Sequence, residues 1–279
     1  MNEEFKPIDS PKGLGWILNY KLKDLKIIAS SVDNYYRKWY KRKLNPDKTP
    51  LIINGKIQKR EINESYGQLK IIQRRIHKRI LKSIKLPKNV LGGISPYNTV
   101  INAFRHKGKK YHFQTDIKKF FPSITNKRVF NTFNNLGFSP PVCSLLTKLT
   151  TKEGNLPQGT PTSTSIANIV FHPIDIEIIK FCDENKITYT RWVDDLNFSA
   201  KYDFNEIILQ ITKIIKDSGF NINNIKTQYK IGPITMTGII TKNNTLTVPQ
   251  ELYNRVKDNS IPEKSRESLQ AYINSVHRG

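Results

Sequence analysis

The sequence YTRWVDDLNFSA, residues 189–200, contains two adjacent aspartates between two short segments of strand character. The flanking segments, ITYTRWV (187–193) and LNFSA (196–200), have the aromatic and aliphatic content of short strands. We therefore predict a tight β-hairpin with Asp194 and Asp195 at its turn. The alternative is that the pair is a simple turn dipeptide, because aspartate favours turns.

The elements around this hairpin follow the order β-α-β-β-α-β. They are a strand at 111–117, a helix at 163–181, the two hairpin strands, an amphipathic helix at 204–218 and a strand at 226–232. This order predicts the split βαβ arrangement, an antiparallel sheet with helices on one face. The end of the first strand then lies beside the hairpin, so Asp116 is expected to converge with Asp194 and Asp195.

Three converging carboxylates repel one another unless a cation lies between them. Mg²⁺ prefers carboxylate oxygens, retains several waters and shares its sites with substrate phosphates. Two such ions about 3.5–4 Å apart can hold the attacking and leaving oxygens of an in-line phosphoryl displacement. These residues therefore predict a magnesium-dependent phosphoryl-transfer site.

The 279-residue chain is strongly basic, with 46 Lys and Arg against 23 Asp and Glu and a formal net charge of +23. Residues 1–90 carry 22 of the basic and 8 of the acidic side chains. Such a field attracts nucleic acid or an anionic membrane. Since we find no run of about 18 apolar residues and no secretory signal, we expect a cytoplasmic nucleic-acid-binding protein without membrane contact. Cys143 and Cys182 are expected to be reduced thiols.

Three segments of the basic N-terminal region have informative patterns. The stretch YYRKWYKRK (35–43) combines cations that bind phosphates with rings that stack on bases, although a helix with buried aromatics is an alternative. Residues 51–62 contain an Asn-Gly step between apolar runs, which predicts a hairpin. Residues 68–85 carry apolar side chains at three- and four-residue steps, which predicts a helix.

Four strings of this sequence resemble, in the correct order, the motifs of reverse transcriptases. They are FQTDIKKFFPSI (113–124) for the first aspartate motif, NLPQGTPTSTSIAN (155–168) for Pro-Gln-Gly, YTRWVDDLNFSA for Tyr-x-Asp-Asp and NINNIKTQ (221–228) for the following lysine motif. Two further strings resemble the retron reverse transcriptases of bacteria, namely INAFRH (101–106) and ITMTGIITKNN (234–244). Together with a finger-like stretch at 59–81, the resemblance covers about residues 35–279.

The resemblance implies an α+β, right-hand polymerase fold with fingers, a split βαβ palm and a short helical thumb. Residues 1–110 are expected to form basic, RNA-facing fingers, residues 111–240 the palm with the catalytic motifs, and residues 241–279 the thumb. Part of 126–160 is also compatible with packing against the fingers.

The resemblance further implies catalytic roles for four residues. Asp116, Asp194 and Asp195 would hold two Mg²⁺ ions, with Ile117 also in the metal-binding set. Lys226 would contact the triphosphate and protonate the pyrophosphate leaving group. The alternative for this lysine is a solvated surface charge.

Nucleotide binding is implied for Arg60, Phe121, Gln158, Gly159 and Lys226. Phe121 would lie under the sugar and exclude a ribose 2′-hydroxyl, unless both it and the preceding Phe belong to the core. Gln158 and Gly159 would contact the nucleotide and template, unless their loop is a plain surface turn. Arg60 would lie near the triphosphate, unless it is one solvated charge among many.

Primer or RNA contact is implied for Trp192, Asn102 and His106. Trp192 replaces the usual tyrosine of the Tyr-x-Asp-Asp motif, which keeps the ring and loses the hydroxyl. Asn102 and His106 form the Asn-Ala-x-x-His pattern of retron enzymes and are interpreted as a structural or RNA-facing feature. A metal site at His106 with His112 is rejected because no Cys or carboxylate cluster completes it.

The implied function is RNA-templated DNA synthesis by a retron reverse transcriptase. Its partners would be a cognate structured non-coding RNA, the DNA copied from it, dNTPs and an effector protein. Priming from an RNA 2′-hydroxyl would give a branched RNA–DNA hybrid (msDNA), used in anti-phage defence. The alternatives are another bacterial reverse transcriptase, of group II intron or non-retron defence type, and a non-catalytic RNA-binding module with a polymerase fold.

Overall fold

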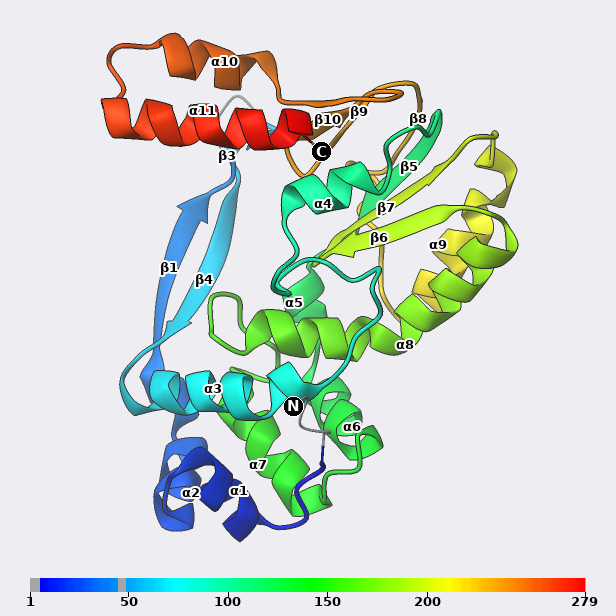
Figure 1. Cartoon of the computed structure of the whole chain (residues 1–279). Coiled ribbons are helices and arrows are strands. Elements are labelled where there is room, and N and C mark those ends of the chain that lie inside the picture. The colour runs from blue at the N-terminus through cyan, green and yellow to red at the C-terminus, as the bar shows by residue number, and fades with distance from the viewer. Residues whose placement is uncertain (1–5, 45–48, 279) are drawn as a thin grey trace. The chain divides into compact units, whose positions relative to one another are not determined.

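A computed structural model describes residues 6–44 and 49–278 of the chain. The chain divides into two compact units, one of Met1–Leu86 with Lys119–Pro173 and the other of Pro87–Lys118 with Ile174–Gly279. Helix α8 (Ser163–Glu184) begins in the first unit and ends in the second. Figure 1 labels the helices and strands of both units.

The first unit is mainly helical. Besides the start of α8, its helices are α1 (Pro11–Leu18), α2 (Leu22–Ser30), α3 (Gly67–Arg79), α5 (Phe120–Ser123), α6 (Asn126–Asn135) and α7 (Pro140–Thr150). Its strands form two antiparallel pairs, β1 (Tyr36–Arg42) with β4 (Lys59–Ser65) and β2 (Ile52–Ile53) with β3 (Lys56–Ile57). Asn54 and Gly55 join β2 to β3 with φ of 51° and 70°, as a type I′ turn requires. The predicted Asn-Gly hairpin is therefore confirmed.

Two expectations for the first unit need correction. The basic aromatic stretch forms strand β1, so its helical alternative is wrong. The helix expected over 68–85 ends at Arg79, because the next residue, Ile80, leaves the helical region at φ −121° and ψ −62°. Near this end, the guanidinium groups of Arg75 and Arg79 donate to backbone carbonyls at the end of α1, with Arg75 Nη1 2.8 Å from the oxygen of Leu18.

The second unit contains a four-stranded antiparallel sheet in the order β6-β7-β5-β8 (Figure 1). Its strands are β5 (Tyr111–Asp116), β6 (Thr188–Trp192), β7 (Asp195–Ala200) and β8 (Gln228–Ile231). Helix α8 precedes β6, and α9 (Ile208–Asp217) follows β7, with Ile211 and Ile215 fully buried. The predicted β-α-β-β-α-β order and the α+β class are therefore confirmed.

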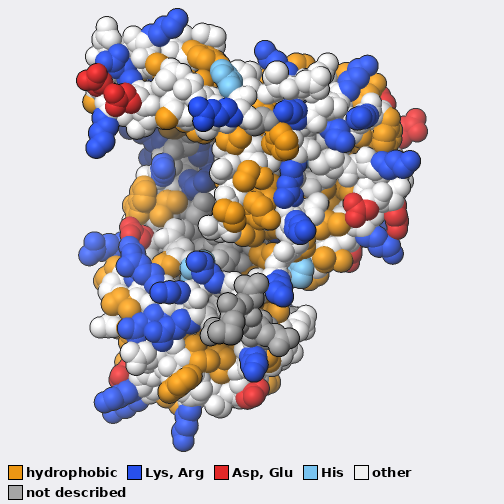
Figure 2. All heavy atoms as spheres, viewed as in Figure 1, with side chains coloured by type: hydrophobic (Ala, Val, Ile, Leu, Met, Phe, Trp, Pro, Cys, Tyr) orange, Lys and Arg blue, Asp and Glu red, His pale blue; other side chains and the backbone are white. Residues whose placement is uncertain are grey.

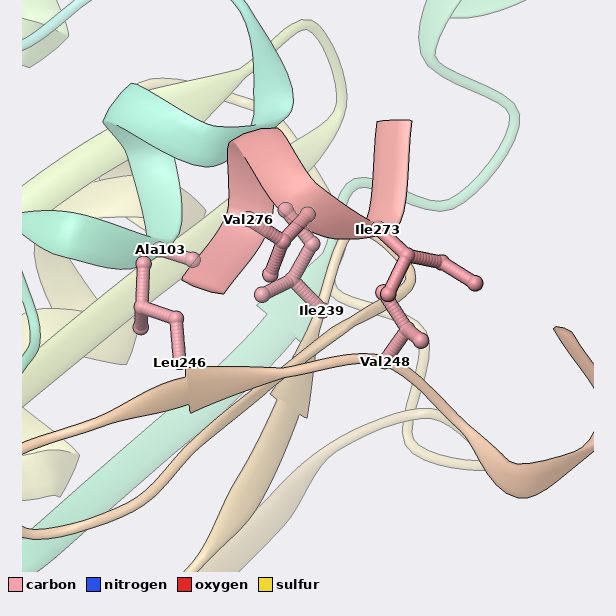
Figure 3. Close-up of a cluster of buried hydrophobic side chains, with 6 residues drawn as sticks. All are labelled: Ala103, Ile239, Leu246, Val248, Ile273 and Val276. Atoms are coloured by element: carbon pink, nitrogen blue, oxygen red, sulfur yellow. The ribbon is translucent and has the colours of Figure 1, made fainter. Parts of the chain in front are cut away.

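The C-terminal part of the second unit has its own apolar core. Its strands β9 (Ile234–Met236), β10 (Ile239–Thr241) and β11 (Leu246–Thr247) form a small sheet, and its helices are α10 (Gln250–Lys257) and α11 (Glu263–Arg278). Figure 3 shows the buried cluster that joins them to α4 (Thr99–Phe104). Its members are Ala103, Ile239, Leu246, Val248, Ile273 and Val276. The division into fingers, palm and thumb stays a prediction.

Candidate active site

Asp116 and Asp195 lie directly opposite each other on the neighbouring strands β5 and β7. The amide of Ile117 donates to the carbonyl oxygen of Asp194 at 3.0 Å, which marks Asp116 and Asp195 as a non-hydrogen-bonded pair. In such pairs the Cα atoms are about 4.5 Å apart and both side chains point to the same face. Strand register therefore brings the carboxylates of Asp116 and Asp195 together, as the topology predicted.

The turn that carries Asp194 is strained. Val193 and Asp194 join β6 to β7, and Trp192 pairs with Asp195 across the turn. Val193 has a φ of 60°, which is a rare conformation for a β-branched residue. A positive φ at the first position of a two-residue turn is typical of type II′, whose twist matches the flanking strands. Such strain persists only where the surroundings impose it.

Lys226 completes this group of side chains. Its ammonium group donates to Oδ2 of Asp116, and the nearby amide of Asn223 donates to the Asp116 carbonyl at 2.8 Å. Burial lowers the pKa of Lys226, but the hydrogen bond to Asp116 and the charges of all three aspartates outweigh this and raise its pKa. Because Lys226 interacts with all three carboxylates, the structure brings together the four residues for which catalysis was predicted.

The oxygen donors at this site suit a divalent cation. Asp116 is 4% exposed, and its Oδ1 is buried without a hydrogen-bond partner. Within residues 6–44 and 49–278, no three or more His, Cys, Asp or Glu side chains are placed so that together they could hold a metal ion. Mg²⁺ usually binds through one or two carboxylates plus substrate phosphates, rather than in an all-protein cage. The residues therefore fit a Mg²⁺ site that substrate would complete.

A buried ion pair is hydrogen-bonded to the strained turn. The guanidinium of Arg191 is fully buried and donates to both carboxylate oxygens of Asp175 on α8, at 2.8 and 2.6 Å. The Tyr189 hydroxyl donates to the same carboxylate at 2.8 Å. Arg191 Nη1 also donates to the carbonyl oxygen of Val193 at 2.8 Å, which ties α8 to the residue between Trp192 and Asp194.

A loop before α4 packs against the same turn. The amides of Leu91 and Gly92 donate to the Arg191 carbonyl at 2.9 and 3.3 Å, and the Arg191 amide donates to the Asn89 carbonyl at 2.9 Å. A Cβ added to Gly92 would lie 2.4 Å from the amide nitrogen of Val193. Sequence reasoning missed Gly92, Arg191 and Asp175. The available signal for the buried pair was one acidic residue, Asp175, and one basic residue, Arg191, each within an otherwise apolar segment.

The structure corrects one prediction, because Asn102 and His106 are buried and cannot contact RNA through their side chains. Asn102 Oδ1 accepts from the Thr190 hydroxyl at 2.6 Å, so the His106 Nε2 that lies 2.7 Å from that hydroxyl must be the donor. His106 Nδ1 then accepts from Ser199 Oγ at 2.7 Å. The structure agrees with the structural interpretation of Asn102 and His106, because their hydrogen bonds connect α4 and the residues after it to β6 and β7.

His106 should make the stability of the protein depend on pH. Burial lowers its pKa from 6.5 to about 3, so the unfolded chain binds more protons between these values. This contribution to stability is complete above pH 6.5 and is lost as the pH falls toward 3. Denaturant titrations at several pH values give the free energy of unfolding as a function of pH. Between pH 3 and 6.5 this free energy should rise less steeply with pH in His106→Gln than in the wild type, by up to about 1.4 kcal/mol per pH unit. Equal slopes would contradict the prediction.

The other predicted nucleotide-binding residues belong to the first unit. Arg60 is exposed on β4, and the amide of Asn63 on the same strand donates to the Gln158 carbonyl at 2.8 Å. Phe120 and Phe121 are only 2% and 9% exposed and lie in the short helix α5. The structure therefore brings the Pro-Gln-Gly loop to the strand that carries Arg60.

Gly159 in this loop should not tolerate a side chain. It has a φ of 107°, and an added Cβ would lie 2.6 Å from Ile62 Cγ2. Gly154 is a matched control, with a φ of 84° and nothing within 4 Å of its added Cβ. We expect Gly159→Ala to lower the free energy of unfolding by about 1–3 kcal/mol more than Gly154→Ala, because only the former overpacks a neighbour. Equal losses in urea titrations would contradict this.

The surface offers many cations to a polyanion. Figure 2 shows Lys and Arg side chains across the face in view, with far fewer Asp and Glu. On β1, Trp39 and Tyr40 are 45% and 57% exposed between Lys38 and Lys41, so two exposed rings are flanked by cations along the strand. This combination is typical of surfaces that bind single-stranded nucleic acid. In the described part of the chain, no helix has the length and apolar character to span a membrane.

Comparison with known proteins agrees with this geometry. Residues 54–242 match the family model "Reverse transcriptase (RNA-dependent DNA polymerase)". The chain belongs to the reverse transcriptase family. As a member of this family it is an RNA-directed DNA polymerase, a nucleotidyltransferase with the right-hand polymerase fold.

Its curated relatives place this reverse transcriptase in the retron group. It is 27% identical to the retron Ec86 reverse transcriptase of Escherichia coli, over 84% of this chain and 71% of that protein. It is 32% identical to the retron Se72 enzyme of Salmonella heidelberg (strain 579083-10), over 75% of this chain and 52% of that protein. It is also 32% identical to the retron Ec83 enzyme of Escherichia coli, over 69% of this chain and 67% of that protein. The matched part thus spans about half of the Se72 enzyme. An apo telomerase from Candida tropicalis is similar at a TM-score of 0.49 and 11% identity, over 72% of this chain and 42% of that one.

Proposed function

We propose that this reverse transcriptase copies a cognate structured non-coding RNA into DNA, starting from a 2′-hydroxyl of that RNA. The product would be a branched RNA–DNA hybrid (msDNA), which would act with an effector protein in anti-phage defence. The observation that carries the proposal is the convergence of Asp116, Asp194 and Asp195 around Lys226. The retron relatives support the type of RNA and product.

The aspartates and the Ile117 carbonyl would hold two Mg²⁺ ions. Bound Mg²⁺ supplies Lewis-acid activation of the primer hydroxyl and charge neutralisation on the triphosphate. Asp116 is the best-supported ligand, because its Oδ1 is buried and has no hydrogen-bond partner. The deep position of Asp116 also keeps its carboxylate aligned by strand β5 rather than by a mobile loop.

Lys226 would contact the triphosphate and donate its proton to the pyrophosphate leaving oxygen. Its side chain is 53% exposed, so its ammonium can turn from Asp116 toward a substrate without leaving a buried cavity. Its raised pKa keeps it protonated at neutral pH, as a general acid requires. Arg60, Phe121, Gln158 and Gly159 would bind the dNTP, and the half-buried Trp192 would contact the primer.

The nucleic acid that copurifies with the protein provides the test. RNA and DNA extracted from the purified protein should include a DNA strand joined by a 2′–5′ linkage to a structured RNA, as read by sequencing before and after debranching. DNA without a branch would assign the chain to another class of bacterial reverse transcriptase. RNA alone, together with no primer extension, would indicate a non-catalytic RNA-binding module.

We place the reaction in the cytoplasm. Cys143 and Cys182 are buried free thiols, and burial raises the pKa of Cys182 to about 12. Cysteines without a disulfide bond are the usual state in a reducing compartment.

A further inference from the structure

A second site in the same unit has the chemistry of a phosphate-binding pocket. It has a volume of about 630 Å³, and the residues that line it are Gly108, Lys110, Lys201, Gly232, Pro233, Lys242, Asn243, Asn244 and Thr245. None of these lining residues is acidic, and in the described part of the chain none of its three lysines forms an ion pair. The hollow, which we call the basic pocket, therefore concentrates positive charge without internal neutralisation.

The basic pocket lies at the end of the four-stranded sheet opposite to the aspartates. Lys110 immediately precedes β5 and Lys201 immediately follows β7, whereas Asp116 and Asp195 are at the other ends of the same two strands. Gly232 follows β8, and its amide donates to the Lys110 carbonyl at 2.8 Å. At about 3.3 Å per residue, β5 separates Lys110 from Asp116 by about 20 Å. The pocket is thus distinct from the candidate active site.

The lining indicates a phosphate group as the ligand. Three ammonium groups, two side-chain amides and a hydroxyl offer hydrogen-bond donors, and the lining residues include no aromatic ring on which a base could stack. Gly108 and Gly232 have φ of 77° and 87°, a region that favours glycine, and they leave their part of the wall without side chains. These features suit the sugar–phosphate backbone better than a nucleobase.

We propose that the basic pocket binds backbone phosphates of an RNA strand, about 20 Å from the point of DNA synthesis. The choice of RNA rests on the proposed function, because the enzyme must hold a structured template while it is copied. A contact at this distance would anchor the template RNA without entering the active site. Because lysines contact phosphates as point charges, the site would bind RNA of any sequence.

The test removes the three charges of the pocket and compares the result with the same loss elsewhere. The pocket variant is Lys110→Gln/Lys201→Gln/Lys242→Gln. The control variant is Lys180→Gln/Lys213→Gln/Lys216→Gln, which changes exposed lysines of α8 and α9. Affinity for a fluorescent RNA hairpin with a single-stranded 3′ tail is measured without dNTPs or Mg²⁺, between about 50 and 200 mM salt. ATP and inorganic phosphate serve as competitors.

We expect the pocket variant to bind the RNA on the order of tenfold more weakly at the higher salt, with a slope of log affinity against log salt reduced by about 2–3. The control variant should keep the wild-type slope. Equal losses in both variants would overturn the proposal, because general charge would then explain binding. Displacement by ATP in the wild type with unchanged RNA affinity in the pocket variant would also overturn it, in favour of a free-nucleotide site. Binding is read without DNA synthesis, so absent polymerase activity would count only against the proposed function.

Discussion

Asp194→Asn should abolish DNA synthesis, with a loss of roughly 10³-fold or more in the rate of primer extension. The substitution keeps the size and turn preference of the side chain and removes one of the three negative charges that surround Lys226. In the proposed site Mg²⁺ binding depends on these charges, so the proposed pair of ions would no longer be held. The measurement is incorporation of dNTPs on a primed RNA template at saturating Mg²⁺.

A matched control distinguishes loss of chemistry from loss of folding. Asp217→Asn changes an exposed aspartate at the end of α9 and should leave both activity and the thermal midpoint at wild-type values. Asp194→Asn should also keep the wild-type midpoint, or raise it slightly, because it relieves repulsion between carboxylates. Wild-type activity in Asp194→Asn would exclude the site described above. An unfolded variant would require the same test with Asp195→Asn.

Arg191→Met should produce the second large effect, a loss of about 3–5 kcal/mol in the free energy of unfolding. The guanidinium and carboxylate of the Arg191–Asp175 pair are both fully buried, so the substitution leaves a carboxylate in the interior without its cation. Urea titration followed by circular dichroism measures this loss. Lys70→Met breaks the half-buried ion pair with Glu64 and should lower the free energy of unfolding by no more than about 1 kcal/mol, because pairs open to solvent contribute little.

A double variant separates the structural role of Arg191 from its role at the turn. Arg191→Met/Asp175→Asn should be more stable than Arg191→Met, since both buried charges are gone and the Tyr189 hydroxyl keeps an acceptor. Its primer extension should stay slow, because the Val193 carbonyl has lost the donor that fixes the strained turn. A double variant with restored stability and full activity would show that Arg191 contributes to folding alone. A single variant within about 1 kcal/mol of wild type would contradict the buried-pair account.

The elements of the sheet were predictable because their signals are local. The residue pattern identified β5, the amphipathic pattern identified α9, and the short link between the two strands predicted a tight hairpin. The turn itself lies at Val193 and Asp194, one residue before the predicted Asp194 and Asp195, because Asp195 already pairs with Trp192 as the first residue of β7. Given those elements, the split βαβ topology leaves Asp116 beside the hairpin, although it lies 78 positions before Asp194. The convergence of the aspartates therefore follows from strand order.

The residues that hold the turn were not predictable in the same way. Gly92 is required because the backbone of Val193 occupies the space that a Cβ at position 92 would need. No local sequence pattern predicts such a contact between distant segments. The retron pattern at Asn102 and His106 was interpreted as a structural or RNA-facing feature, and only the structure shows that these buried side chains bond to β6 and β7.

Periodicity, turn chemistry and motif order were thus sufficient to place the acids on one hairpin and one neighbouring strand, and to indicate phosphoryl transfer. Packing of distant segments decided the rest: the Arg191–Asp175 pair beneath the turn, the burial of His106 and the lysines gathered at the far end of the sheet. The physical reason is that periodicity and turn preference are set by neighbours in the chain, whereas desolvation depends on every segment that folds against a side chain.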